Sequence, residues 1–429
     1  MQIGIARKDI TPSVGLDLSG FIAREGPCTG VHDPLYLTAL VAEEDGKSVA
    51  LISCDLIGLG AALVRRVRER VATRTGIPTR AQLYACTHTH AGPETGVITS
   101  LGEPDPTYLA GLEDALVAVV EAAASARQPA ILGWLRGESH AAHNRVLKRA
   151  GQDDTRIDPE VLVARVSTPA GEPIGTILHY TCHPVAAGPE NRLASADWCG
   201  VVRQQLEEAG SGPVVVVNGA GGDINPRMER RGFAAVGDAG QAIAEVATRL
   251  WQDARPVDAV DVAADHALVP LTMLPPAGPD AVSDFWEAWQ TAQREHPVGS
   301  VPYRSAMVIY RDHARRLTRL HWGSELVPQY HGETQALRVG PLAIVSLPGE
   351  FFSAYGMRIK ASSPAPATLI AGWANDNLGY FPTAEAFPIG GYEMDTASRY
   401  YGYPAPWSPE AGAAVAERAI QLVKELYPP

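Results

Sequence analysis

Long apolar runs are missing from this 429-residue sequence. The longest of them, such as residues 213–217, are far shorter than the ~20 residues that a membrane-spanning helix needs. The first residues, 1–8, contain no apolar core of the kind that a secretory signal has. We therefore expect no membrane segment and a cytoplasmic location.

Cysteine and positive charge are also scarce. The five cysteines include no Cys-x-x-Cys pair, and three of them lie inside apolar runs, so we expect reduced core residues rather than disulfides. The 36 Lys and Arg residues against 48 Asp and Glu residues leave a net charge of -12. Because no basic run supplies a face for a phosphate backbone, we expect no nucleic-acid partner. The sequence is compatible with a monomer or a homo-oligomer.

Helical and strand patterns alternate along the chain, which predicts an α/β fold with a mixed central β-sheet flanked by helices. No internal repeat or low-complexity tract is visible. Strands are expected at 2–11, 35–43, 48–56, 82–86, 130–135, 161–166, 174–182, 213–217, 261–268 and 368–374, with a hairpin over 334–347. Helices are expected at 61–74, 107–126, 197–208, 237–251 and 413–427.

The domain organisation predicted from these patterns is a single unit of residues 1–429. Two polar helices within 281–320 predict a helical insertion or lid at about 278–322. Residues 275–279 and 375–401 are expected to be loops. The second loop contains six aromatic residues, and a loop of that length with such a composition is expected to be functional.

The segment 87–93, Thr-His-Thr-His-Ala-Gly-Pro, follows the apolar run 81–86. If a strand continues through the threonines, the side chains of His88 and His90 leave it on the same side. Ala91-Gly92-Pro93 extends neither a helix nor a strand ladder, so the chain must turn there. Two imidazoles at such a strand exit could bind a metal ion. The alternative is a pair of hydrogen-bonded histidines near a turn.

Three further strand exits carry side chains that bind metals. His183 follows the strand 174–182, Asp223 lies in the glycine-rich segment 218–226, and Glu350 follows the hairpin 334–347. The glycines allow backbone amides to approach a ligand, although a tight structural turn is the alternative and no nucleotide-binding spacing is present. The structural alternatives for His183 and Glu350 are a histidine bonded to backbone and a carboxylate at a helix N-terminus.

His88, His183 and Glu350 together predict a Zn²⁺ site. A catalytic zinc ion takes about three N or O ligands from the protein and leaves one position for water, and two histidines with a glutamate are a common set. The ion would lower the pKa of that water toward ~7 and polarise a carbonyl. The same set also suits iron or manganese.

These motifs, in this order, resemble the N-terminal catalytic domain of the neutral ceramidases, zinc amidases that hydrolyse the N-acyl bond of ceramide. The resemblance runs nearly end to end. It rests on Gly4 with Asp9-Ile10-Thr11, Gly30-Val31-His32, Thr87 to Pro93, Asn144-Arg145, Pro173-Ile174-Gly175-Thr176-Ile177 with His183-Pro184, Asp197 with Gly200, Gly222-Asp223 with Pro226, Pro348-Gly349-Glu350, Asn375 to Tyr380, and Tyr392-Glu393.

Carried over by position, the resemblance implies a neutral-ceramidase-like fold whose zinc ligands are His88, His183, Glu350 and Tyr380. It also implies that His90 faces the substrate carbonyl as a hydrogen-bond donor or proton shuttle. Tyr392 would then stabilise the developing oxyanion. The residues themselves support the first three ligands but do not single out Tyr380 among the tyrosines of its loop.

Two features depart from the family pattern. Where the ceramidases have the serine of a Gly-Asp-x-Ser-Pro segment, this chain has Asn225. An amide cannot be acylated, so Asn225 would at most orient the substrate. The chain also ends at Pro429 without the family's C-terminal immunoglobulin-like domain, and on this basis we expect a small or polar amide substrate rather than long-chain ceramide.

The hypothesis from the sequence is a zinc-dependent hydrolase that cleaves a carbon–nitrogen amide bond with metal-activated water. His90 or Asp223 would pass the proton to the leaving nitrogen. Asn144 and Arg145 would bind the substrate, with the planar fork of Arg145 on a carboxylate unless it makes a structural ion pair. A metal-dependent esterase, lactonase or phosphoesterase is one alternative. The other is a non-catalytic binding protein on the same fold, suggested by Asn225.

Overall fold

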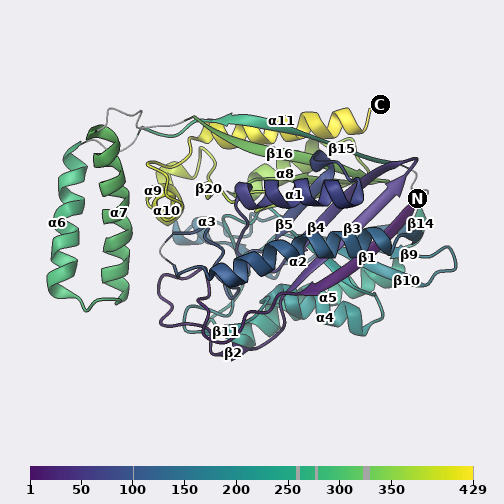
Figure 1. Cartoon of the computed structure of the whole chain (residues 1–429), viewed down its shortest axis with the longest axis horizontal. Coiled ribbons are helices and arrows are strands. Elements are labelled where there is room, and N and C mark those ends of the chain that lie inside the picture. Colours follow the sequence, from purple (N-terminus) through teal and green to yellow (C-terminus); the bar gives the residue numbers. More distant parts are fainter. Residues whose placement is uncertain (100, 258–260, 276–278, 322–328, 429) are drawn as a thin grey trace.

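Helices and strands alternate along the chain in the computed structural model (Figure 1), which describes residues 1–99, 101–257, 261–275, 279–321 and 329–428 and gives only the backbone of 279–284 and 312–321. The strands are β1 (Gln2–Asp9), β2 (Gly30–Val31), β3 (Tyr36–Glu44), β4 (Lys47–Cys54), β5 (Gln82–Cys86), β6 (Gln128–Pro129), β7 (Ile131–Glu138), β8 (Ala142–Asn144), β9 (Glu160–Ser167), β10 (Pro173–Tyr180), β11 (Leu193–Ala194), β12 (Val214–Asn218), β13 (Ile224–Pro226), β14 (Pro256–Val257), β15 (Val262–Leu271), β16 (Tyr330–Val339), β17 (Leu342–Ser346), β18 (Glu350–Phe351), β19 (Ala367–Ala371) and β20 (Tyr380–Phe381).

The α-helices are α1 (Ala61–Thr75), α2 (Pro106–Ser125), α3 (Arg145–Arg149), α4 (Trp198–Glu208), α5 (Phe233–Asp253), α6 (Pro279–Glu295), α7 (Val301–His321), α8 (Ser353–Ser362), α9 (Tyr392–Asp395), α10 (Ala397–Tyr400) and α11 (Pro409–Leu426). Two 3-10 turns, η1 (Thr79–Ala81) and η2 (Phe387–Ile389), complete the described secondary structure.

One order of elements occurs three times, although the sequence shows no repeat. Each unit consists of an antiparallel hairpin, a helix, and a strand that pairs in parallel with the second strand of the hairpin. The units are β3-β4-α1-β5, β9-β10-α4-β12 and β16-β17-α8-β19. Since paired parallel strands end at the same edge of a sheet, the loops that leave them are brought together there.

The α/β class is confirmed, but the strands form several sheets rather than one central sheet. The main sheets have the orders β5-β4-β3-β1-β6, β12-β10-β9-β7-β14 and β15-β16-β17-β19, and the shorter pairs are β11-β2, β13-β8 and β18-β20. Each unit begins a sheet of its own because its hairpin pairs locally. Strand β12 packs against strands of both other main sheets. Its four valines are buried, as the lack of alternation in 213–217 predicts.

Amphipathic helices cover the sheets. The first sheet is covered by α2, whose apolar residues pack on β1 and β3, and the second is covered by α5, which packs on β7 and β9. Helices α8 and α11 lie against each other and on the third sheet. Helix α5 begins at Phe233, one turn before the predicted start, and α11 begins at Pro409.

Two predicted segments need correction or restriction. The segment 375–401 is not an irregular loop, since it contains β20, η2, α9 and α10. Within the predicted insertion, α6 and α7 lie side by side and project from the sheets (Figure 1), and the Trp289 and Tyr310 rings stack between them at 5.2 Å. Residues 276–278 and 322, which belong to the predicted loop and to the ends of the insertion, lie outside the described residues. A lid function for α6 and α7 stays a prediction.

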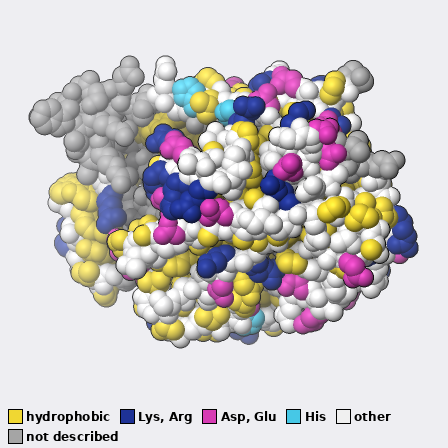
Figure 2. Space-filling model, turned by 45° about the vertical axis from the view of Figure 1, so that its right-hand side comes forward, with side chains coloured by type: hydrophobic (Ala, Val, Ile, Leu, Met, Phe, Trp, Pro, Cys, Tyr) yellow, Lys and Arg dark blue, Asp and Glu magenta, His cyan; other side chains and the backbone are white. Residues whose placement is uncertain are grey.

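The surface is mixed in charge. Figure 2 shows Lys and Arg side chains close to Asp and Glu side chains over much of one face. All five cysteines are buried and free. Among the helices that the structure describes, none combines the length and the apolar character that crossing a bilayer requires.

Candidate metal centre

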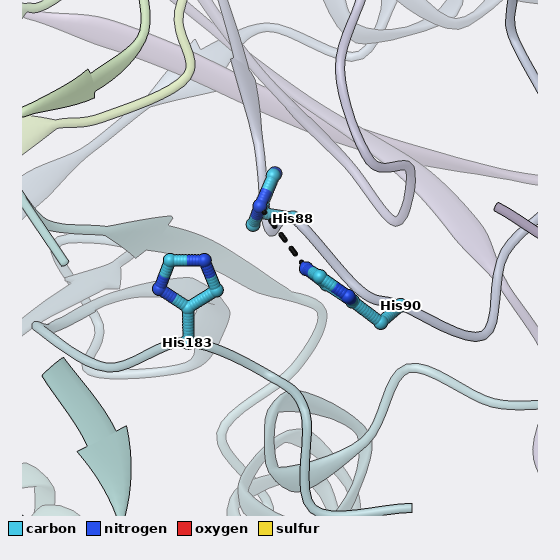
Figure 3. Close-up of side chains that lie close together, drawn as sticks. All are labelled: His88, His90 and His183. Carbon is cyan, nitrogen blue, oxygen red and sulfur yellow. Dashed lines mark hydrogen bonds between the residues drawn. The ribbon is translucent and has the colours of Figure 1, made fainter. Parts of the chain in front are cut away.

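Three histidines from two strand exits converge in the interior (Figure 3). His88 and His90 follow β5, and His183 follows β10. One ring nitrogen from each can be chosen so that all three lie within 4.8 Å of one another. His88 and His183 are buried, whereas His90 is partly exposed. The predicted meeting of strand exits therefore places three imidazoles around one centre.

The backbone at His88 differs from the predicted continuing strand. Strand β5 ends at Cys86, and His88 has a φ of +66°, a left-handed conformation that costs a non-glycine residue about 1–2 kcal/mol. The amide of His88 donates to the carbonyl of Leu56 at 3.0 Å, and its ring stacks on Trp373 with centroids 4.3 Å apart. These contacts offset the strain. They, and not the alternation of side chains along a strand, hold the His88 ring at the centre.

Glu350 completes a set of ligand atoms with the spacing of a metal site. Its Oε2 lies 3.0 Å from Nε2 of His183 and 3.5 Å from Nε2 of His88. Tetrahedral zinc with bonds of about 2.0–2.1 Å places its ligand atoms roughly 3.3 Å apart. Oε2 of Glu350 and Nε2 of His183 are buried and have no hydrogen-bond partner among the described residues. Buried polar atoms without a partner are rare, so the residues present fit a bound cation.

Hydrogen bonds on the outer side of the ligands fix their orientation. Nδ1 of His88 lies 2.6 Å from the carbonyl oxygen of Ile57, and Nδ1 of His183 lies 2.6 Å from that of Gly221. A carbonyl only accepts, so each Nδ1 carries the proton and each Nε2 presents a lone pair to the centre. The hydroxyl of Tyr401 donates to Oε1 of Glu350, which leaves Oε2 facing the histidines.

Gly222 allows the chain to pass close behind Glu350. A Cβ atom at this position would lie 2.4 Å from the carbonyl oxygen of Glu350, a distance that side chains do not tolerate. The amide of Gly222 also donates to the carbonyl of Phe351 at 2.9 Å. The glycine-rich segment therefore supports the strand exit that carries Glu350, which is the close backbone approach for which glycine is needed.

The protonation states suit metal binding at neutral pH. Burial and then the charge of Arg145 lower the pKa of His183 to about 4. Burial and then His88 lower the pKa of His90 well below its ordinary value. Burial alone would raise the pKa of Glu350, but the imidazoles of His88 and His183 outweigh it and hold that pKa well below its ordinary value. Neutral imidazoles and an ionised carboxylate are the forms that bind a cation.

His90 lies at the edge of the centre. Its Nε2 is 3.2 Å from Nε2 of His88, and its ring lies 4.9 Å from that of Phe21. Because Nδ1 of His88 already carries a proton, Nε2 of His90 is the donor in this pair as long as no cation takes the lone pair on Nε2 of His88. Gly20 has a φ of +104°, and a Cβ there would lie 2.5 Å from the His90 ring. The backbone of Gly20 therefore confines His90 on one side.

The two predicted tyrosines lie beside the centre. Tyr380 is the register partner of Glu350 in the β18-β20 pair, and its hydroxyl accepts a hydrogen bond from Arg145 at 2.9 Å. Tyr392 begins α9, and its ring meets that of Tyr380 edge to face at 5.7 Å. The residue is 42% exposed, whereas burial of its hydroxyl raises the pKa of Tyr392 above its ordinary value.

Arg145 contacts four groups inside the protein. Its guanidinium donates to Oδ1 of Asn225 at 3.2 Å and to the carbonyl of Gly222 at 2.7 Å, besides the bond to Tyr380. Its Nε lies 3.0 Å from Oε1 of Glu393. Burial disfavours the charge of Arg145, but Tyr380 and Glu393 outweigh it and raise the pKa. These contacts correspond to a structural ion pair and not to a guanidinium that is free to bind a substrate carboxylate.

Asp223 and Asn144 are bonded to each other and to helix ends. Oδ2 of Asp223 accepts from Nδ2 of Asn144 at 2.6 Å, and Oδ1 accepts from the amide of Ser353, the first residue of α8, at 2.7 Å. Oδ1 of Asn144 caps α3 through the amides of Val146 and Leu147. Burial raises the pKa of Asp223 to about 6. These bonds direct both side chains toward α3 and α8.

A family model described as neutral/alkaline non-lysosomal ceramidase, N-terminal, matches residues 1–221, which is more than half of the chain. The chain belongs to this family. The resemblance predicted from the motifs is thereby confirmed.

Named relatives within the family are neutral ceramidases. The one from Pseudomonas aeruginosa is 27% identical over 215 residues, which is 46% of this chain and 32% of the relative. The one from Oryza sativa subsp. japonica is 24% identical over 225 residues, 48% of this chain and 28% of the relative. The chain thus matches about a third or less of the length of these relatives.

The crystal structure of neutral ceramidase from Pseudomonas aeruginosa shares the fold over nearly the whole chain. Its TM-score is 0.77 at 18% identity, and the match covers 99% of this chain and 74% of that chain. The predicted neutral-ceramidase-like fold is confirmed by this match, which at such identity concerns the fold alone.

Two residues of the centre of this ceramidase-family chain are missed by sequence reasoning. They are Trp373 under His88 and Tyr401 behind Glu350. The aromatic content of 375–401 is a signal that could have pointed to Tyr401, but it does not rank one tyrosine above the others. Trp373 carries no local pattern, and Glu393 appears in the family motifs without its contact to Arg145, because these contacts join segments far apart in the chain.

Proposed function

We propose that this chain is a metal-dependent hydrolase that cleaves a carbon–nitrogen amide bond. The observation that carries the proposal is the convergence of His88, His183 and Glu350, with two buried polar atoms that have no hydrogen-bond partner among the described residues. Membership of a family whose named relatives are neutral ceramidases supports an amide as the bond.

The residues that would hold the metal are His88, His183 and Glu350, with Tyr380 as a fourth. We propose zinc, because two imidazoles and a carboxylate at this spacing suit that ion, and a five-coordinate zinc would keep a position for water beside the four side chains. When bound, such an ion polarises a carbonyl and lowers the pKa of water toward ~7.

His90 is the residue that we assign to proton transfer. Its Nε2 carries a proton at the edge of the centre, and its pKa is low, so it can donate a hydrogen bond to a substrate carbonyl and return to the neutral form. Asp223 is bonded to Asn144 and Ser353, and we therefore assign Asp223 and Asn144 to positioning the segment 222–226.

Tyr392 and Arg145 complete the assignment. The hydroxyl of Tyr392 would donate to the oxygen on which negative charge develops. Arg145 positions Tyr380 and Asn225 through its guanidinium. Asn225 would orient the substrate by its amide.

Metal removal tests the proposal as a whole. Exhaustive chelation should abolish cleavage of an amide from a panel of N-acyl compounds, and stoichiometric zinc should restore it. Activity that persists when the metal content has fallen to a small fraction of one ion per chain would contradict the proposal. Cleavage of esters without any cleavage of amides would favour an esterase.

Paired variants separate ligands from the proton carrier. His183→Gln should lose bound metal and activity together. His90→Gln should keep its metal and lose about 10²–10⁴-fold in kcat, the range for a general acid or base. Loss of metal in His90→Gln would instead show that His90 is a ligand.

A further inference from the structure

A groove of about 880 Å³ is lined by residues within 187–193 and 230–233, together with Thr29. It runs between the segment after His183 and the segment before α5, and arginines dominate its charged lining. Arg192, Arg230 and Arg231 face it against one acidic residue, Glu190. In a chain with a net charge of -12, a surplus of positive charge at this place is a local exception.

Phe21 connects the groove to the centre. Its ring lies 4.9 Å from the ring of His90. The guanidinium carbons of Arg24 and Arg231 each lie 5.3 Å from the centroid of the same ring. The Phe21 ring therefore contacts both Arg231 and His90, which places Arg231 one aromatic ring away from the centre.

The two arginines on Phe21 differ in what their guanidinium groups bind. Arg24 is buried and donates to four backbone carbonyls, those of Leu18, Ser19, His90 and Asn191. Arg231 is exposed, and no described residue accepts a hydrogen bond from it. Partial burial and then the charge of Arg145 lower the pKa of Arg231. Arg24 is thus structural, whereas the charge of Arg231 is available to a ligand.

The backbone holds Arg231 at this position. The amide of Gly232 donates to the carbonyl of Ala186 at 2.7 Å, three residues beyond His183. Gly188 has a φ of +83°, and a Cβ there would lie 2.8 Å from Cβ of Arg231. The segment that supplies a metal ligand therefore also fixes the start of the Arg231 side chain.

We propose that this groove binds an anionic oxygen group on the far end of the amide substrate, with Arg231 as the specificity residue. The inference rests on the proposed function and narrows its substrate class to amides that also carry a carboxylate or a similar oxyanion. A planar guanidinium suits such a group because it offers two parallel donors. Arg145, whose two terminal nitrogens already donate to Asn225, Gly222 and Tyr380, does not supply this contact.

Matched substrates test the groove on the metal-loaded protein. Adipic acid monoamide carries the carboxylate, and hexanamide has the same chain without it. We expect the wild type to prefer the monoamide, and Arg231→Gln to lose about tenfold in kcat/KM for the monoamide alone, as a charge-assisted hydrogen bond of roughly 1.4 kcal/mol predicts. Arg227→Gln is the matched control, since Arg227 is also exposed but contacts Asp154 and does not line the groove.

A binding measurement separates this inference from the proposed function. 6-Oxoheptanoate replaces the amide by a ketone that hydrolysis does not cleave, and 2-heptanone is its neutral counterpart. Calorimetry should show tighter binding of 6-oxoheptanoate, lost in Arg231→Gln and kept in Arg227→Gln. Such binding without any amide cleavage would support the anion site in the groove and contradict the proposed hydrolase function. Equal affinity for the charged and neutral compounds, or an equal loss of affinity in both variants, would overturn the inference.

Discussion

Tyr401→Phe tests whether the groups behind the ligands set the affinity of the centre. The hydroxyl of Tyr401 donates to Oε1 of buried Glu350, and the variant removes that oxygen atom while keeping the ring. A hydrogen bond to a charged group contributes about 1.5–3 kcal/mol. Since 1.4 kcal/mol is a factor of ten, metal affinity should fall roughly 10–100-fold, which is the range for partners of metal ligands.

The assay is a competition titration of zinc with a chromogenic chelator. Tyr403→Phe is the matched control, because Tyr403 lies in the same segment but its hydroxyl has no hydrogen bond to a described residue; its ring packs on Trp407 at 4.8 Å. We expect the control to keep the wild-type affinity. Wild-type affinity in Tyr401→Phe as well would refute the idea that this bond orients Glu350 for a cation.

Two further predictions concern stability. Gly222→Ala should lower the free energy of unfolding by about 1–3 kcal/mol in urea titrations, because its Cβ would lie 2.4 Å from the carbonyl oxygen of Glu350. Gly237→Ala in α5, where a Cβ meets nothing within 4 Å, should raise the free energy of unfolding by up to about 1 kcal/mol. Equal effects of the two substitutions would contradict the packing at Gly222. Burial, and then the charge of Lys360, lower the pKa of His179 to about 3. Below pH ~6.5 His179 therefore binds a proton in the unfolded chain but not in the folded protein. The free energy of unfolding should fall as the pH decreases toward 3, by up to about 1.4 kcal/mol per pH unit. His179→Gln should flatten this slope between pH 7 and pH 5 and exposed His331→Gln should not; an unchanged slope in His179→Gln would reject the assignment.

The strand exits of this chain could be predicted from the sequence because their signals are local. Apolar runs that break at His88, His183 and Glu350 mark the ends of strands, and parallel pairing brings such ends together at one edge. The spacing of Asn144, Arg145 and Tyr380 alone did not show what they contact. Their place at the centre was available only through the family resemblance.

The remaining features depend on contacts between distant segments. The positive φ of His88 is held by Leu56 and Trp373, and Glu393 meets Arg145 from a helix that the sequence presents as loop. No periodicity encodes these pairings. The threefold order of hairpin, helix and strand is likewise invisible in the sequence, because it repeats a topology and not a set of residues.

The most direct test of the centre is the metal content of the purified protein, measured by mass spectrometry of the element. The wild type should carry one zinc ion per chain, and Glu350→Gln should carry almost none while remaining folded. The control Glu385→Gln, at an exposed position, should match the wild type. A wild type that binds no metal, or a Glu350→Gln protein that binds it as tightly as the wild type, would contradict the proposal that His88, His183 and Glu350 hold a single cation.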